Sequence, residues 1–156
     1  YEIPLRLVGW EMCIRDSTIT VAENIAESNA QATIRTASIS TGNDDRDAHV
    51  KNEDFFAVEQ YPEITFKATN LNVDENGNGT VTGDLTIKGT TKSVDLDVED
   101  IATAEVPFGN TRLGFEATAK INRKEFGIDF NAPLKTGGVL VSEEIKIELE
   151  VSAIKQ

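Results

Sequence analysis

The sequence has few of the side chains that enzymes use as nucleophiles or metal ligands. It holds one cysteine, Cys13, and one histidine, His49, among 156 residues. One cysteine cannot form a disulfide within the chain, and one Cys with one His falls short of a four-ligand zinc site. No serine stands in a G-x-S-x-G sequence, which exposes the nucleophile of many hydrolases. We therefore predict a protein that is not an enzyme and that holds no metal and no cofactor.

Positive charge is also scarce. The chain has 15 Lys and Arg residues against 27 Asp and Glu, which gives a formal charge of −12 and a pI near 4.5. Nucleic acids and anionic membrane surfaces are recognised by clustered Lys and Arg, which this composition does not supply. No apolar run approaches the roughly 20 residues that a membrane-spanning helix needs. The sequence thus predicts neither a nucleic-acid partner nor a membrane span.

The first seventeen residues, YEIPLRLVGWEMCIRDS, differ from the rest of the chain. They hold its only Trp, Met and Cys, and they lack an apolar period that fits the segments after them. They also resemble a translated sequencing adapter, with Trp10 in place of an expected serine. We expect residues 1–17 to be a non-native artefact, residues 18–156 to form a single domain, and native N-terminal strands to be missing. The sequence leaves the compartment open between periplasmic or secreted and cytoplasmic.

Residues 64–151 alternate repeatedly between apolar and polar side chains. Ile64, Phe66 and Ala68 share one face of a strand, and similar stripes run through residues 81–87, 94–98, 113–121 and 145–151. Turns rich in Gly, Asn and Asp separate the first of these segments. This alternation predicts antiparallel strands, each with one apolar and one polar face. Sheets of this kind either stack as sandwiches or close as barrels, and alternation alone does not decide between the two.

Strand length and small residues favour the barrel. The segments 113–121 and 139–154 are long for sandwich strands. Gly83, Gly114 and Ala117 provide small positions at which long strands can coil and leave interior space. We therefore predict an all-β fold, an antiparallel β-barrel. A barrel of eight strands is about the size that can hold one small ligand among its inward side chains.

Residues 74–79, DENGNG, match the start of a calcium-binding loop. The twelfth position of that loop, where calcium loops need a Glu, is Leu85. We therefore predict a hairpin turn and no metal site.

A short helix is predicted near residues 43–51, because Asn43 or Asp44 can cap it and carboxylates fill its first turn. Arg46 and His49 lie three residues apart on one side of this helix. They either hold the polar or anionic headgroup of a ligand at the barrel mouth, or pair with nearby acidic residues and tether the helix. The aromatic pair Phe55 and Phe56 follows, and each ring can fill the core or line a cavity.

Several segments in order closely resemble the YceI-like family of bacterial proteins: ISTGNDDRDAHVKNEDFF, YPEITFKAT, VTGDLTIKGTTKSVDLDVE, TRLGFEATAKINRKEFGI and GGVLVSEEIKIELEVSAIKQ. The resemblance implies a lipocalin-like barrel that binds, transports or stores a long-chain isoprenoid or related lipid without catalysis. Candidate ligands are a polyprenyl phosphate, an isoprenoid quinone and a fatty-acid derivative. The residues expected to line the lumen are Phe55, Phe56, Phe66, Val81, Leu85, Leu96, Phe115, Ala117 and Phe126.

Two other functions stay open at this point. A structural or interaction module would have a filled core and would present its acidic surface to a partner. A hydrolase that uses only Asp or Glu is a third class, because acidic residues are numerous. Association into a homodimer is compatible with each of these functions.

Overall fold

The computed structural model describes residues 3–7, 10–14, 18–20, 29–105, 111–131 and 142–154, and strands dominate these segments. One short α-helix, α1 (Asp44–Lys51), lies in the described part of the chain. The strands are β1 (Ile3–Leu7), β2 (Trp10–Ile14), β3 (Thr18–Thr20), β4 (Asn29–Arg35), β5 (Glu63–Val73), β6 (Gly79–Ile87), β7 (Thr90–Glu105), β8 (Thr111–Asn122) and β9 (Glu144–Ile154). Two single-turn 3-10 helices, η2 (Thr36–Ser38) and η3 (Arg123–Phe126), follow β4 and β8.

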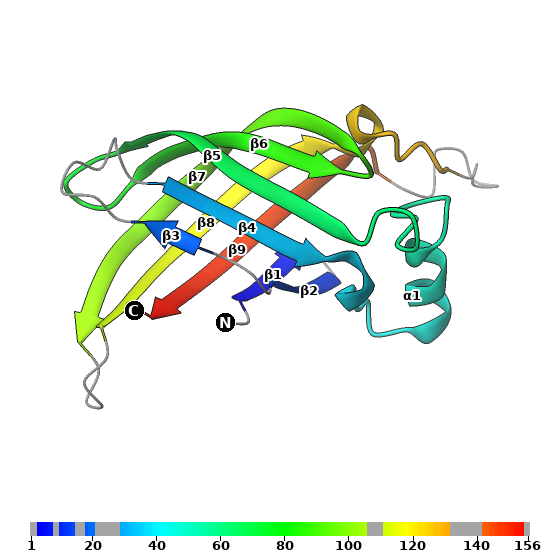
Figure 1. Cartoon of the computed structure of the whole chain (residues 1–156), viewed down its shortest axis with the longest axis horizontal. Coiled ribbons are helices and arrows are strands. Elements are labelled where there is room, and N and C mark those ends of the chain that lie inside the picture. Colours follow the sequence, from blue (N-terminus) through cyan, green and yellow to red (C-terminus); the bar gives the residue numbers. More distant parts are fainter. Residues whose placement is uncertain are drawn as a thin grey trace.

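The strands form one curled antiparallel sheet in the order β2-β1-β9-β8-β7-β6-β5-β4-β3. One further pairing, between Ile14 of β2 and Ile34 of β4, joins the two sides of the curl. Figure 1 shows the strands wrapping around a common interior, with α1 and the segment after β8 at the same end. The predicted all-β antiparallel barrel is confirmed.

Part of the N-terminal segment joins the sheet. Residues 3–7 and 10–14 form a hairpin whose strand β1 pairs with β9. Without β1, that edge of β9 would present unpaired backbone N–H and C=O groups, and such an edge readily pairs with another extended segment. The non-native origin of residues 1–17 and the absence of native strands remain predictions.

Irregular pairings bend the long strands. The register shifts between Ala68 and Asn70 on β5, and between Glu99 and Ala102 on β7. At the second shift Asp100 adopts φ +56°, and its backbone N–H donates to Asn78 Oδ1 at 3.1 Å. Bulges of this kind increase the local twist of a strand. They let an eleven-residue and a sixteen-residue strand curve around the interior.

The predicted turn between β5 and β6 is confirmed. Asp74 Oδ1 accepts from the backbone N–H of Asn76 at 2.8 Å and of Asn78 at 3.0 Å. Gly77 takes φ +81°, a conformation that glycine adopts without strain. The Asp74 carboxylate therefore organises the hairpin.

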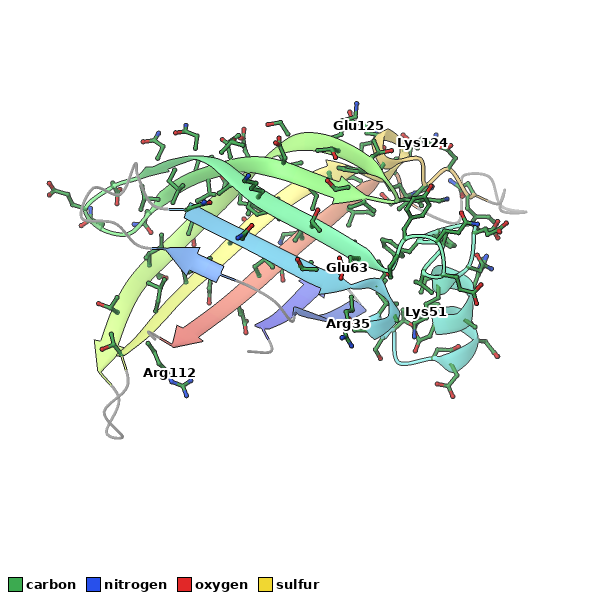
Figure 2. All side chains as sticks on the ribbon, in the orientation of Figure 1. Arg35, Lys51, Glu63, Arg112, Lys124 and Glu125 are labelled. Carbon is green, nitrogen blue, oxygen red and sulfur yellow. The ribbon has the colours of Figure 1, made fainter. Side chains whose placement is uncertain are left out.

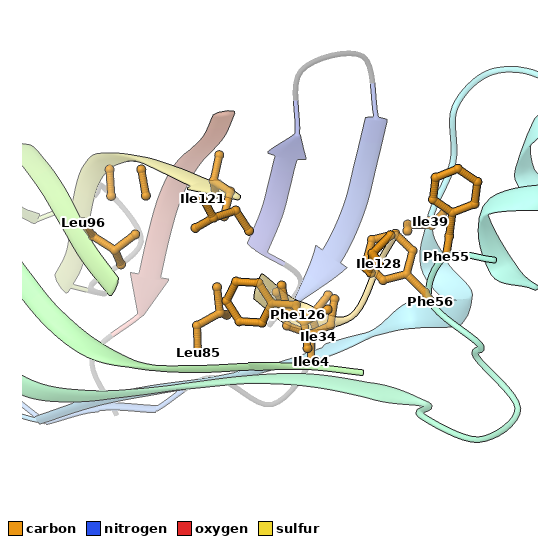
Figure 3. Packing of buried hydrophobic residues seen from close by; sticks show 14 of the residues in the cluster. Ile34, Ile39, Phe55, Phe56, Ile64, Leu85, Leu96, Ile121, Phe126 and Ile128 are labelled. Atoms are coloured by element: carbon orange, nitrogen blue, oxygen red, sulfur yellow. The ribbon is translucent and has the colours of Figure 1, made fainter. Parts of the chain in front are cut away.

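Alternate residues of the strands fill the interior, as the apolar stripes predict. Ile64, Leu85, Val98, Ala117 and Ile121 are all buried. At the end that carries α1, further side chains complete the core, namely Ile39, Val50, Phe55, Phe56, Phe126 and Ile128 (Figure 3). The interior is thus one continuous apolar core that runs from the strands to the segments around α1.

Charged side chains point away from the sheet (Figure 2), and some like charges stand side by side. Glu99, Glu116 and Glu150 are direct partners across β7, β8 and β9. All three residues are exposed, and none takes part in an ion pair within the described chain. Like charges directly opposite each other destabilise a sheet. By contrast, Arg35 faces Glu63 across β4 and β5, which is a favourable pair.

We expect the substitution Glu116→Gln to raise the free energy of unfolding by about 0.5 kcal/mol, because it relieves two repulsions at once. The gain should shrink in high salt, which screens exposed charges. Urea unfolding at low and high salt measures both effects. Glu63→Gln is the control and should give no gain, since it removes an attraction; equal effects of the two substitutions would contradict the interpretation.

Candidate ligand-binding cavity

The interior of the curled sheet holds a partly open cavity of about 90 Å³. This volume is several times the roughly 10–15 Å³ that a cavity needs to hold one water molecule. All but one of the residues around it are apolar. They are Ala32, Ile34, Phe56, Ile64, Phe66, Leu85, Ile87, Val94, Leu96, Ile121, Arg123, Phe126, Ile128, Ile145, Ile147 and Leu149.

Five of the nine residues predicted to line the lumen lie around this cavity: Phe56, Phe66, Leu85, Leu96 and Phe126. Phe56 follows α1, Phe126 ends η3, and the other three come from consecutive strands. Figure 3 shows Phe56 on the side of α1, Phe126 between Phe56 and Leu85, and Leu96 farther along the interior. The strands and the end segments therefore build the cavity together. Whether these residues touch a ligand remains a prediction.

The other four predicted residues do not line the cavity. Val81 and Ala117 are buried in the core, Phe115 is half-buried against it, and Phe55 packs beside α1. Alternation along a strand fixes which face a side chain takes, but not its level along the barrel. The apolar pattern therefore predicted correctly that Val81 and Ala117 face inward, but it could not predict their position along the barrel.

The sequence prediction missed most of the aliphatic lining. Ile34 of β4 and Ile145, Ile147 and Leu149 of β9 surround the cavity. The β9 residues belong to an apolar stripe that was visible in the sequence. The contribution of β4 was not, because its neighbours Ala30 and Ala32 are small and its alternation is short.

Arg123 is the one charged residue at the cavity, and it is 1% exposed. Its Nε donates to the carbonyl oxygen of Ser142 and its Nη1 to that of Ile128, each at 2.7 Å. Its backbone N–H donates to the carbonyl of Glu143 at 2.9 Å. A buried charge is costly unless it is hydrogen-bonded. Arg123 therefore ties β8, the segment after η3 and the start of β9 together at the end of the cavity.

An exposed ion pair continues this link. Lys124 Nζ lies 2.6 Å from Glu143 Oε1, and the side chains are about half exposed. The hydrogen bond and charge of Lys124 hold the pKa of Glu143 below its usual value, and Arg123 adds to the effect. The next carboxylate, Glu144, lies 3.6 Å from Lys120 Nζ. These pairs are exposed and stabilise the fold only weakly.

The RDxH sequence of α1 builds a hydrogen-bonded start to the helix. Asn43 is the N-cap, and its side chain accepts from Arg46 N at 3.0 Å, as predicted. Arg46 donates through Nε to Thr41 Oγ1 at 3.0 Å and through Nη2 to Thr41 O at 2.8 Å. Asp47 Oδ1 accepts from the Thr41 hydroxyl at 2.6 Å and from its N–H at 2.7 Å. These bonds lower the pKa of Asp47.

His49 lies in an aromatic cluster at the same end. Its Nε2 is 3.0 Å from Asp54 Oδ2, and its ring meets the rings of Phe55 and Phe130 edge-on at centroid distances of 5.1 and 4.8 Å. The structure thus pairs His49 with a nearby acidic residue, as the structural alternative states, whereas Arg46 bonds to Thr41 and not to a carboxylate. A role for Arg46 and His49 with a ligand headgroup remains a prediction.

In the segments that the structure describes, no group of three or more His, Cys, Asp and Glu side chains is arranged to hold a metal ion. None of the helices in the same segments has the length and apolar character needed to cross a bilayer.

Known proteins are similar to this chain in sequence and in fold. The profile of the YceI-like domain matches residues 12–153. A UPF0312 protein of Staphylococcus aureus is 42% identical over 120 residues, which cover 76% of this chain and 67% of that protein. The chain belongs to the YceI-like family.

Solved structures agree with this membership. The crystal structure of the Campylobacter jejuni YceI protein aligns with a TM-score of 0.76 and 31% identity, over 92% of this YceI-like chain and 83% of the other. A polyisoprenoid binding domain from Saccharophagus degradans aligns with a TM-score of 0.58 and 15% identity, over 97% and 90% of the two chains. The second match is a likeness of fold alone.

The lowered pKa of Asp47 predicts how stability depends on pH. Its carboxylate favours the folded state at neutral pH, and that contribution disappears as the pH falls below the ordinary value of 3.8 through the lowered pKa. Asp47→Asn should therefore lower the urea midpoint at pH 7, with a difference from the unsubstituted protein that closes in acid.

The control for this prediction is Asp45→Asn. Asp45 also lies in the first turn of α1, but no hydrogen bond to Thr41 involves its side chain. Its substitution also removes one negative charge from the positive end of the helix dipole, but it leaves the Thr41 bonds intact. Identical pH profiles for the two variants would rule out the Thr41 bonds as the cause.

Proposed function

We propose that this YceI-like protein binds the hydrocarbon chain of an isoprenoid or related lipid inside the barrel and does so without catalysis. The observation that carries the proposal is the interior cavity, whose lining is apolar except for Arg123. Such a surface gives a polar substrate few hydrogen bonds and gives a hydrocarbon chain contacts on every side. Binding sites for small molecules are typically concave and apolar, with few polar groups.

The hydrophobic effect accounts for the affinity of such a site. Burying one methylene group contributes about 0.8 kcal/mol, so affinity rises with the length of chain that the cavity covers. At about 90 Å³ the cavity covers only part of a long polyprenyl chain. The proposed ligand therefore either is short or leaves part of its length outside this cavity.

The relatives support the class of ligand. The Saccharophagus degradans domain is described as polyisoprenoid binding, and it shares the fold of this chain. Carried over to this protein as part of the proposal, that property fits an apolar interior. A polyprenyl phosphate, an isoprenoid quinone and a fatty-acid derivative all present the same kind of chain, and they differ in the end group.

The end group is proposed to lie near α1. Arg46 and His49 are the candidates to meet it, since α1 lies at the end of the barrel where Phe56 and Phe126 line the cavity. Both candidates already hold partners, Thr41 and Asp54. A headgroup there would have to share or replace these bonds, so the chain is expected to contribute more to affinity than the end group does.

An interaction module is the second candidate function. The row of Glu99, Glu116 and Glu150 on the outer face favours it, because an unneutralised acidic row can meet a basic partner. Such a module needs no ligand inside the barrel. Uptake of lipid therefore discriminates between the two functions, and a homodimer is compatible with either.

Native mass spectrometry after mild extraction from the source bacterium tests the proposal. A bound lipid of discrete mass is the expected result, because an apolar chain leaves such a cavity slowly. Apo protein alone, together with no uptake of added farnesol or fatty acid, would refute lipid binding and favour the interaction module.

A bulky side chain inside the cavity should weaken lipid binding. Ala32 lines the cavity from β4, so the indole of Ala32→Trp should occupy space needed by the chain and lower affinity at least about tenfold. Gln31→Trp is the control. Gln31 is exposed and precedes Ala32 on the same strand, so its side chain points to the outer face. Equal binding by both folded variants would place the ligand elsewhere.

A further inference from the structure

Phe66 occupies a distinctive position among the phenylalanines that line the cavity. Phe56 and Phe126 lie at the end near α1, whereas Phe66 comes from β5 within the sheet. Its side chain is only half-buried, although the aliphatic residues around it, Ile64 and Leu85, are buried.

The ring of Phe66 lies directly over Gly83 of β6. A β-carbon at Gly83 would collide with the ring, at 2.6 Å from Cε2 and closer still to Cζ. The same β-carbon would lie 2.7 Å from the carbonyl oxygen of Lys67, so any residue other than glycine would also press on the backbone. Gly83 thus provides the space in which the phenyl ring rests.

The strand register shows which levels of the barrel this contact joins. Phe66 pairs with Leu85, and both line the cavity. The next inward pair along the same strands is Ala68 with Gly83, and neither lines it. The ring of Phe66 therefore extends from the level of the cavity to the level beyond it.

Small, buried side chains occupy the interior beyond this ring. Ala68, Val81, Val98, Ala117 and Ala119 are all between 1% and 9% exposed, and none of them lines the cavity. One strand pairing joins two of these residues directly, Val98 with Ala117. A bulky ring thus stands between an apolar cavity and a region built from small apolar residues.

We infer that Phe66 sets the depth of the cavity and thereby the length of hydrocarbon chain that the protein prefers. This inference rests on the proposed function, since it concerns the same site. With the ring in place on Gly83, the chain ends against Phe66. Without the ring, the chain can advance along the small residues toward Ala68 and Ala117.

A series of prenyl alcohols of increasing length, geraniol, farnesol and geranylgeraniol, tests the inference by isothermal titration of the purified protein. For the unsubstituted protein we expect affinity to rise with length and then level off. In Phe66→Ala the plateau should move to a longer alcohol, with at least about tenfold tighter binding of the next member of the series, because more methylene groups are buried. Phe66→Leu should shift the plateau in the same direction by less and keeps the test available should the alanine variant not fold.

Phe115→Ala is the matched control. Phe115 is also a half-buried phenylalanine on a strand, and it packs against the core without lining the cavity. Phe115→Ala also removes one phenyl ring, and it should leave the order of affinities for the three alcohols unchanged. A shift confined to the Phe66 variants supports the inference.

The outcomes separate the two proposals. Should the unsubstituted protein bind none of the alcohols, the proposed function fails and the inference fails with it. Should it bind them while folded Phe66→Ala or Phe66→Leu keeps the original length profile, only the inference is overturned. A shift of equal size in Phe115→Ala would likewise overturn it, because the effect would then reflect a loosened core.

Discussion

Along the described strands β4 to β9, alternate side chains point into one shared interior, and the other features of the molecule depend on this constraint. Successive residues of a strand face opposite sides, so a sheet that curls around itself must bury one half of its side chains. The buried half is apolar, and the outward half carries the acidic surplus of the chain. The cavity and the charged surface are thus two sides of the same strands.

Hydrogen bonds organise the end of the interior that lies near α1. At the end near α1, Arg123 links three segments through main-chain carbonyls, while Arg46 and Asp47 hold Thr41 at the start of the helix. These polar bonds position apolar side chains, Phe56 and Phe126, over the cavity. Hydrogen bonds at this end therefore fix where the cavity stops, and the apolar lining determines what it can hold.

Much of this architecture could be predicted from the sequence. Period-two alternation identified the antiparallel strands and their inward faces, and the Asn43 cap located the short helix to within a residue. Local signals of this kind are strong, because they reflect the geometry of a single strand or helix turn.

Other features depend on contacts between distant residues and left no local signal. The level of Val81 or Ala117 along the barrel follows from strand register and shear, which a single strand does not encode. The buried position of Arg123 depends on carbonyls at Ile128 and Ser142. The pairing of residues 3–7 with β9 reflects an available sheet edge more than the side chains that fill it.

Methyl NMR of protein labelled at isoleucine, titrated with farnesol, tests most directly whether the interior takes up a hydrocarbon chain. Ile34, Ile64, Ile121 and Ile147 line the cavity, whereas Ile39 is buried outside it and Ile101 packs against the core elsewhere. Binding inside the barrel predicts intermolecular NOEs from farnesol to the four cavity methyl groups and none to Ile39 or Ile101. NOEs to Ile39 or Ile101 alone, or no NOE to any of these methyl groups at saturating farnesol, would contradict a hydrocarbon-binding interior.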